Sequence, residues 1–383
     1  ILHNGKFHPM PPGLMLGIPT KWKPLLQTGL ISAKGKARAA LDLIIPRRQD
    51  AGDEAVGAFL NRRLGREVAE NLADPLLSGI YAGNLDELSL QATFPQFAHI
   101  ERQYRSLIYG MRENSKQGQK AASALPNHAM KSTFLSYRGG LKTLVQALEE
   151  KLRDIERING EKVSRIAESG SGIELHLQSG RVLAADAAVL AVPAFAAAEL
   201  LADLPASGLL KEIEYVSVAN VVLAFHQEDI PQKLGGTGFL VPRKEKRQIT
   251  ACTWTSSKWL HTAPEGKALL RCYVGRSGDE SWTELTDAEL VRSVRSELKR
   301  LMGIEQQPLF YEVTRWHRAM PQYRVGHLTR LERVKEELTA RLPGVFLAGS
   351  AYYGVGIPDC IRQGKEAAEQ VCRHVAELTT ARC

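Results

Sequence analysis

The chain has 383 residues, of which 44% are hydrophobic and 24% charged, enough for a sizeable core and two or three structural regions. Its five cysteines are odd in number and lack a Cys-x-x-Cys spacing, which argues against a disulfide framework or a zinc site and favours a reducing cytoplasm. The net charge of +8 favours anionic partners, but no nucleic-acid-binding motif accompanies it. No apolar run reaches the roughly 18 residues that a membrane-spanning helix needs, whereas peripheral membrane contact stays open.

The first residues predict a β-hairpin, because Asn4-Gly5 stands between short apolar runs and both turn positions favour positive φ. The chain begins at Ile1 rather than Met, and no signal peptide precedes the hairpin. We therefore expect the N-terminus to be a truncation.

A mainly helical stretch is predicted next, from Pro24 to about Asn114. Within it, one apolar stripe at helical spacing consists of Val56, Leu60, Leu64, Val68 and Leu72. The Asp74-Pro75 step predicts the end of that helix, since the residue before proline avoids the α region.

The middle of the chain predicts a helix followed by a β-meander. The helix runs from Leu141 to about Arg157, with apolar residues at Leu141, Leu144, Val145, Leu148 and Leu152. The apolar period then changes to two, and the nearly all-apolar run Val182 to Val192 predicts a strand buried on both faces. A meander that leads into such a strand is typical of the joint between two halves of a large nucleotide-binding sheet.

Residues 196 to 310 predict a second region built on an antiparallel sheet. A helix is expected from Asp287 to Met302, and the strands are Val216–Phe225, Ile249–Thr255 and Ala268–Val274. The chain then closes with a strand from Val345 to Ala348, a glycine-rich loop and a helix from about Pro358 to Leu378.

The glycine-rich loop is the most informative segment. A buried strand runs into Gly349, while Gly354 and Gly356 permit close approach of the backbone, and Pro358 suits the first turn of a helix. Free N–H groups and the positive end of the helix dipole would face whatever occupies the loop. This geometry suits a phosphate, a carbonyl or the pyrimidine edge of a flavin, although the same pattern is also typical of a simple tight connection.

Several ordered blocks resemble the protoporphyrinogen/coproporphyrinogen oxidase family over essentially the whole chain. They are Pro75–Gly83, Leu88–Leu90, Thr93–Pro95, Arg105–Leu107, Gly238–Pro242, Ala263–Gly266, Tyr273–Gly275, Thr314–His317, Met320–Tyr323 and Gly354–Ile361. The sequence is most similar to the soluble Gram-positive branch, whose usual substrate is coproporphyrinogen III.

The resemblance implies an α/β fold with three parts: an incomplete FAD-binding Rossmann-like domain, an antiparallel-sheet substrate domain and a helical domain, as in p-hydroxybenzoate hydroxylase and the amine oxidases. The family's opening βαβ unit, with its glycine-rich turn for the FAD pyrophosphate, has no counterpart here. The expected ranges are 1–20 and 196–312 for the substrate domain, 21–134 for the helical domain, and 135–195 and 313–383 for the FAD-binding domain.

The resemblance also implies site residues. FAD contacts are expected from Val163, near the adenine, from Trp316, near the isoalloxazine, and from Gly349, Gly354, Val355, Gly356 and Ile357. The porphyrinogen is expected between Gly79, Ile80, Leu240, Thr253 and Tyr273. A polar Thr253 suits a substrate with four carboxylates better than one with two. No metal site is expected, because the histidines lack metal-ligand spacing.

The implied reaction is oxidation of coproporphyrinogen III to coproporphyrin III in haem biosynthesis, with molecular oxygen as acceptor and hydrogen peroxide as by-product. The flavin carries the chemistry, so no catalytic side chain is assigned, and a haem-pathway enzyme is a possible partner. Three alternatives stay open: protoporphyrinogen IX as the substrate, a distant amine oxidase, or a cofactor-free porphyrin-binding fragment without activity. We also expect the chain alone to aggregate or to stay flavin-free.

Overall fold

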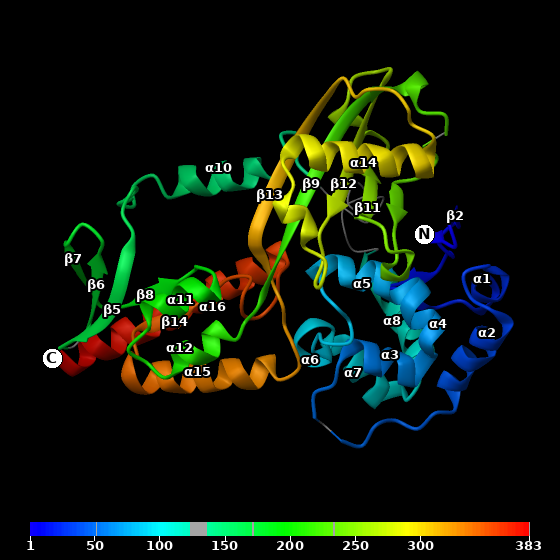
Figure 1. Ribbon diagram of the computed structural model, residues 1–383. Helices are drawn as coiled ribbons and strands as arrows, with labels where there is room; N and C mark the ends of the chain where they lie inside the picture. Colours follow the sequence, from blue (N-terminus) through cyan, green and yellow to red (C-terminus); the bar gives the residue numbers. More distant parts are fainter. Residues whose placement is uncertain (51, 123–135, 171, 233, 383) are drawn as a thin grey trace.

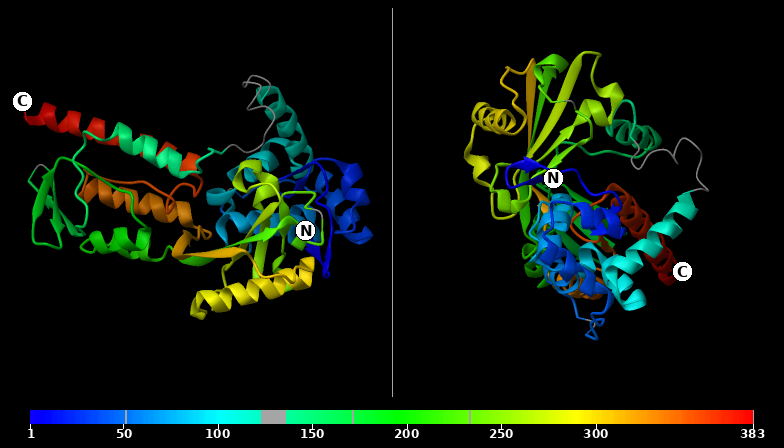
Figure 2. Two further views of the ribbon diagram at one scale, coloured as in Figure 1. Left: turned by 90° about the horizontal axis from the view of Figure 1, so that it is seen from above. Right: turned by 90° about the vertical axis from the view of Figure 1, so that its right-hand side faces the viewer.

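The computed structural model describes residues 1–50, 52–122, 136–170, 172–232 and 234–382. The molecule is elongated, and its two chain termini lie near opposite ends (Figures 1 and 2). Three hydrophobic clusters form its cores: one in the N-terminal helices, one under a five-stranded sheet, and one in the part that contains the C-terminal helices. The long strands β9 (Tyr215–His226) and β13 (Phe310–Pro321) run from the sheet towards the third part.

The N-terminal hairpin is confirmed. Strands β1 (Leu2–His3) and β2 (Lys6–Phe7) pair antiparallel, and the turn residues Asn4 and Gly5 have φ of 51° and 73°. A second short pair follows, β3 (Leu14–Met15) with β4 (Ile18–Pro19). The helical region then comprises α1 (Trp22–Gln27), α2 (Ala33–Ala40), α3 (Val56–Leu64), α4 (Arg66–Val68), α5 (Asp74–Tyr81), α6 (Leu90–Thr93), α7 (Pro95–Tyr104) and α8 (Leu107–Ala122).

The predicted single helix through Leu72 is wrong in its boundaries, although all five residues of its stripe are buried in the first cluster. The helix breaks at Gly65, whose φ of 85° disfavours any side chain, and whose added Cβ would lie 2.4 Å from Cγ of Arg38. A short π-helical stretch, Ala69–Ala73, then leads into α5. Asp74-Pro75 begins α5 instead of ending a helix, because proline is tolerated in a first turn that lacks N–H partners.

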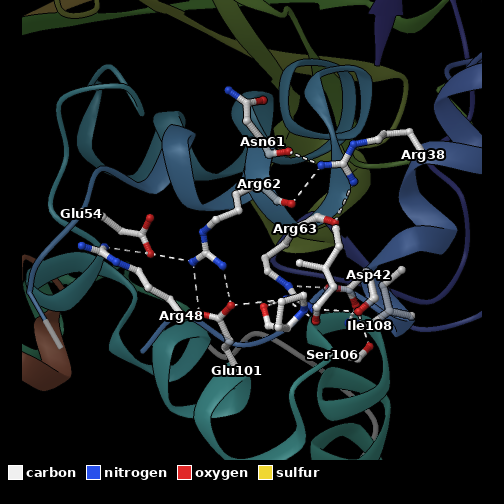
Figure 3. Close-up of polar contacts among 12 residues, drawn as sticks. Arg38, Asp42, Arg48, Glu54, Asn61, Arg62, Arg63, Glu101, Ser106 and Ile108 are labelled. Atoms are coloured by element: carbon white, nitrogen blue, oxygen red, sulfur yellow. Dashed lines mark hydrogen bonds and ion pairs between the residues drawn. The ribbon is translucent and has the colours of Figure 1, made fainter. Parts of the chain in front are cut away.

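A buried ionic network ties the helical region together (Figure 3). The guanidinium of Arg63 and the carboxylate of Asp42 are both fully buried, with Nε 2.7 Å from Oδ1. Asp42 also accepts from the Ser106 hydroxyl at 2.6 Å and the Ile108 N–H at 2.9 Å. Arg62 pairs with Glu101 at 2.6 Å at the partly exposed rim. Each buried charge has several hydrogen-bond partners. These partners offset the free-energy cost of moving the charge from water into the protein interior.

The three strands predicted between residues 196 and 310 are confirmed; they belong to an antiparallel sheet of five strands in the order β10-β11-β12-β9-β13. Its remaining strands are β10 (Gly238–Leu240), β11 (Ile249–Trp254) and β12 (Lys267–Val274), and the short helix α13 (Thr255–Lys258) follows β11. Helix α14 (Asp287–Met302) begins at a capping box formed by Thr286 and Glu289 and packs its apolar side on one face. The opposite face of the five-stranded sheet is not covered by α14.

The third part holds the antiparallel ribbon β5 (Val163–Ser169), β6 (Gly172–Leu177) and β7 (Val182–Ala185), and the parallel pair β8 (Ala188–Leu190) and β14 (Val345–Leu347). Helices α11 (Ala194–Leu200), α12 (Ala206–Lys211), α15 (His327–Arg341) and α16 (Ile357–Arg382) surround them (Figure 1). The predicted strand Val182 to Val192 is wrong: the chain bends at Asp186, and its halves join different sheets. Val182 and Val189 are 49% and 40% exposed.

Two predicted domain boundaries differ from the packing. Residues 196–213 lie with the third cluster through α11 and α12, and all of β13 belongs to the five-stranded sheet. Residues 123–134 of the predicted helical domain lie outside the described residues.

Helix α10 (Lys142–Lys151) is shorter than predicted and buries none of its residues. It lies apart from the three cores, above the third part (Figure 1). Its apolar stripe is therefore exposed in the described part of the chain, with Leu141, Val145, Leu148 and Leu152 each between 51% and 55% accessible.

Candidate active site

A cavity of about 680 Å³ lies between α5 and the five-stranded sheet. The sequence-predicted substrate residues Gly79, Ile80, Leu240, Thr253 and Tyr273 all line it, together with the predicted flavin neighbour Trp316. The structure thus brings together side chains from positions nearly 240 residues apart in the chain. Most of the lining is apolar, with Asn220 and Thr250 among its polar side chains.

The register of the sheet explains why these residues share one wall. Leu240 pairs with Ala251, Ala251 with Tyr273, and Tyr273 with Asn220, so the four stand in one row across neighbouring strands. Alternate residues of a strand point to opposite faces. The side chains between them, such as Cys272, pack under α14 instead.

Helix α5 supplies the facing wall. An added Cβ on Gly79 would have no atom within 4 Å, and the next residue, Ile80, is 42% exposed. Gly79 therefore leaves room for a flat ligand to approach the helix backbone. At the start of the same helix, burial raises the pKa of Asp74 to about 6, against the opposing effects of Arg243 and Arg276.

The glycine-rich loop lies between β14 and α16. Gly349 and Gly354 have φ of 128° and 123°, values that disfavour side chains. A Cβ on Gly349 would meet open space, whereas one on Gly354 would overlap Cγ of Asp359 at 2.6 Å. Helix α16 directs its N-terminal, positive end at this loop. An open glycine before a helix N-terminus fits the electron-rich edge of a flavin, so the residues present are compatible with that group.

Residues beyond the predicted set hold the loop in place. The Tyr323 hydroxyl donates to the Ser350 carbonyl at 2.6 Å and accepts the Gly354 N–H at 3.0 Å. The Gln363 side chain accepts from the N–H groups of Gly349 and Tyr353, both at 3.3 Å. Tyr323 belongs to a block that resembles the family, but nothing in the sequence indicates that its hydroxyl bridges the loop.

The buried ring of His327 packs against the ring of Tyr323. Their rings stack at 4.1 Å between centroids. Nε2 of His327 lies 2.9 Å from the Tyr352 carbonyl, which can only accept, so the proton resides on Nε2. Burial lowers the pKa of His327 to about 4, so the ring is neutral at pH 7.

An aromatic pair links the loop to the helix α5, whose residue Ile80 lines the cavity. Tyr81, at the end of α5, lies 5.5 Å from Tyr323 between ring centroids, and Tyr323 accepts the Gly354 N–H. Val355 packs against the helical core, and Ile357 is 46% exposed. Trp316, 42% exposed, lines the cavity from β13 just before an irregularity in the pairing of that strand.

Val163 is separated from these residues. It lies on the ribbon strand β5 and packs against the third cluster, while the ribbon stands at the C-terminal end of α16 (Figure 1). Its predicted adenine contact stays a prediction. Over the described ranges, no group of three His, Cys, Asp or Glu residues could hold a metal ion, and no helix is long and apolar enough to cross a membrane.

Comparison with known proteins identifies the group to which the chain is related. The model of the family "Flavin containing amine oxidoreductase" matches residues 1–372. The coproporphyrinogen III oxidase of Bacillus subtilis is 46% identical over 96% of this chain and 77% of its own length. That of Staphylococcus aureus is 39% identical over 99% of the chain and 81% of its own length.

Solved structures agree with the sequence relatives. A crystal structure of an Exiguobacterium sp. 255-15 protein is 34% identical and superposes with a TM-score of 0.83 over 98% of this chain and 79% of that one. The cyclohexylamine oxidase of Brevibacterium oxydans, 17% identical with a TM-score of 0.59 over 90% of this chain and 74% of its own, shares the fold. The chain therefore belongs to the flavin-containing amine oxidoreductase family, within its group of coproporphyrinogen and protoporphyrinogen oxidases, and is an oxidoreductase.

Proposed function

We propose that this protein oxidises coproporphyrinogen III to coproporphyrin III in haem biosynthesis, with FAD as cofactor, molecular oxygen as acceptor and hydrogen peroxide as by-product. The observation that carries the proposal is the mainly apolar cavity lined by Gly79, Tyr273 and Trp316, in a chain 46% identical to a coproporphyrinogen III oxidase. The reaction removes six hydrogens from the macrocycle, so three oxygen molecules become three of hydrogen peroxide.

The cavity residues bind and orient the macrocycle. Leu240 and Tyr273 present apolar contact from the sheet, and Gly79 lets the ring lie close to α5. Bound FAD supplies the two-electron acceptor for each cycle. The loop residues Gly354, Val355 and Gly356 would hold its flavin edge. Because the mainly apolar walls exclude water and fix the ring, positioning is the main contribution expected from this chain.

Support for the finer points comes from single features. Thr253 places a hydroxyl-bearing side chain on the cavity wall, which suits a tetracarboxylate better than the dicarboxylate protoporphyrinogen IX. The odd number of cysteines, without a Cys-x-x-Cys spacing, supports a reducing compartment such as the cytoplasm.

The test is turnover of coproporphyrinogen III under air, with and without added FAD, followed by porphyrin fluorescence and peroxide release. Protoporphyrinogen IX, assayed in parallel, should react more slowly. Flavin binding, read from the absorbance spectrum, separates an inactive apo-chain from a protein that cannot oxidise porphyrinogens. A flavin-loaded protein without porphyrin formation above the no-protein control would refute the proposal.

A substitution in the cavity wall tests whether the activity depends on the cavity. Gly79→Phe places a ring in the open space beside α5 and should abolish porphyrin formation without lowering the melting temperature. Gly208→Phe is the matched control, because Gly208 is also an exposed helical glycine with no atom within 4 Å of an added Cβ, but lies on α12. Equal activity in both variants would place the substrate elsewhere.

A further inference from the structure

Within the described strands, Arg271 stands on the side of the sheet that faces the cavity, beside the lining residue Thr253. Arg271 stands in the middle of β12, two residues before Tyr273, and its register partners are Thr253 on β11 and Val222 on β9. Because alternate residues share a face, Arg271 lies on the same side as Tyr273 and Thr253, which both line the cavity. Its chain neighbours Leu270 and Cys272 are fully buried on the opposite side, under α14.

Arg271 lacks a partner within the part of the chain that the structure describes. Its Nε is buried without a hydrogen bond, and no ion pair reaches its guanidinium. On the same row as Arg271, Glu312 stands two strands away across Val222 and makes no ion pair with it. A buried donor without an acceptor costs free energy, so a ligand oxygen within reach of this guanidinium would be bound favourably.

Two other arginines near this wall, Arg276 and Arg243, already have acceptors. Arg276, which lines the cavity and is 8% exposed, donates to the Arg247 carbonyl at 2.6 Å. Arg243 donates to the carbonyls of Ser277 at 2.7 Å and Gly83 at 3.2 Å. Among the described residues, Arg271 thus differs from Arg243 and Arg276 in having no acceptor for its guanidinium.

We infer that Arg271 is a specificity-determining residue that binds a propionate carboxylate of the macrocycle, an assignment that rests on the proposed function. Two residues of a strand span about 7 Å. A ring that packs on Tyr273 would therefore place a peripheral substituent, rather than its centre, at the guanidinium. The planar fork of arginine matches a carboxylate with two parallel hydrogen bonds. A neutral substituent at that place would leave the cation unpaired.

The experiment compares an acid with its neutral isostere. Coproporphyrin III and its tetramethyl ester are titrated into the protein in the same dilute nonionic detergent, and binding is followed by porphyrin fluorescence. Arg271→Gln should weaken binding of the acid at least about tenfold, the usual effect of removing a charge-assisted hydrogen bond. It should change binding of the ester less than about twofold, and Arg271→Lys should restore part of the acid's affinity.

The control variant is Arg292→Gln, which removes the same charge from an exposed position of α14, on the other side of the sheet. It should leave both affinities unchanged. If Arg271→Gln weakens the binding of acid and ester equally, the residue has a structural role. If it changes the binding of neither, another group binds the carboxylate. Either result would overturn the assignment and leave the proposed function intact. If the wild type binds neither porphyrin, the proposed substrate class itself fails, and the assignment with it.

Discussion

Helices α3 and α10 share a sequence pattern but have opposite environments. Both carry apolar residues at helical spacing with charged residues between them. In α3, Val56, Leu60 and Leu64 are fully buried in the helical core. In α10, Val145 and Leu148 are more than half exposed. The comparison teaches that periodicity specifies which side of a helix is apolar, whereas only the arrangement of neighbouring elements decides whether that side is covered.

The largest expected effect concerns the charges next to α3. Arg63→Leu leaves the Asp42 carboxylate buried without its ion-pair partner, and we expect a loss of about 3–5 kcal/mol in the free energy of unfolding. Urea denaturation followed by circular dichroism measures it. Arg66→Leu is the control, because its pair with Glu70 is 82% exposed on the arginine side and should contribute less than about 1 kcal/mol. Similar losses in both variants would contradict the role of burial.

A matched pair of leucines tests the comparison itself. Leu60→Ala on α3 removes a fully buried side chain and should cost about 2–5 kcal/mol. Leu148→Ala on α10 removes one that is 53% exposed and should change stability by less than about 0.5 kcal/mol. The same denaturation experiment serves both variants. A large loss for Leu148→Ala would mean that another element covers α10 in solution.

The dependence of stability on pH tests burial at a titratable side chain, His327. Because burial lowers the pKa of His327 to about 4 in the folded protein, against about 6.5 in the unfolded chain, the unfolded state binds the proton first. The stability due to neutral His327 is complete above pH 6.5 and is lost as the pH falls towards 4. His327→Gln should show a shallower decline of melting temperature over that interval. An unchanged slope would show that His327 is not buried as a neutral ring.

The smallest expected effect on stability comes from charges placed on α10. Val145→Lys combined with Leu148→Lys should leave the unfolding free energy nearly unchanged, since both side chains are exposed, but should reduce self-association of the chain, because an exposed apolar stripe promotes it. Light scattering at increasing protein concentration measures this. If another element covers the apolar stripe of α10 in solution, these two substitutions would instead unfold the protein.

Much of the fold was predictable from the sequence because local signals decide it. The Asn4-Gly5 hairpin follows from turn chemistry, three of the five strands of the sheet from their strand-like composition, and α14 from its helical pattern between Asp287 and Met302. The cavity residues could be predicted only through a resemblance that spans the chain, since no local pattern joins Gly79 to Tyr273.

Tertiary structure alone decided the rest. The helix break at Gly65 depends on the close approach of Arg38, and the division of the predicted strand at Asp186 depends on which strands are available to pair. The same holds for Tyr323, which reaches the glycine-rich loop across 31 residues, and for Arg271, whose Nε has no acceptor among the described residues once the sheet is assembled. The sequence by itself determined which residues are apolar, which turn and which alternate, because these are properties of neighbours in the chain. Contacts between distant segments decided which of them meet, because burial and pairing are properties of neighbours in space.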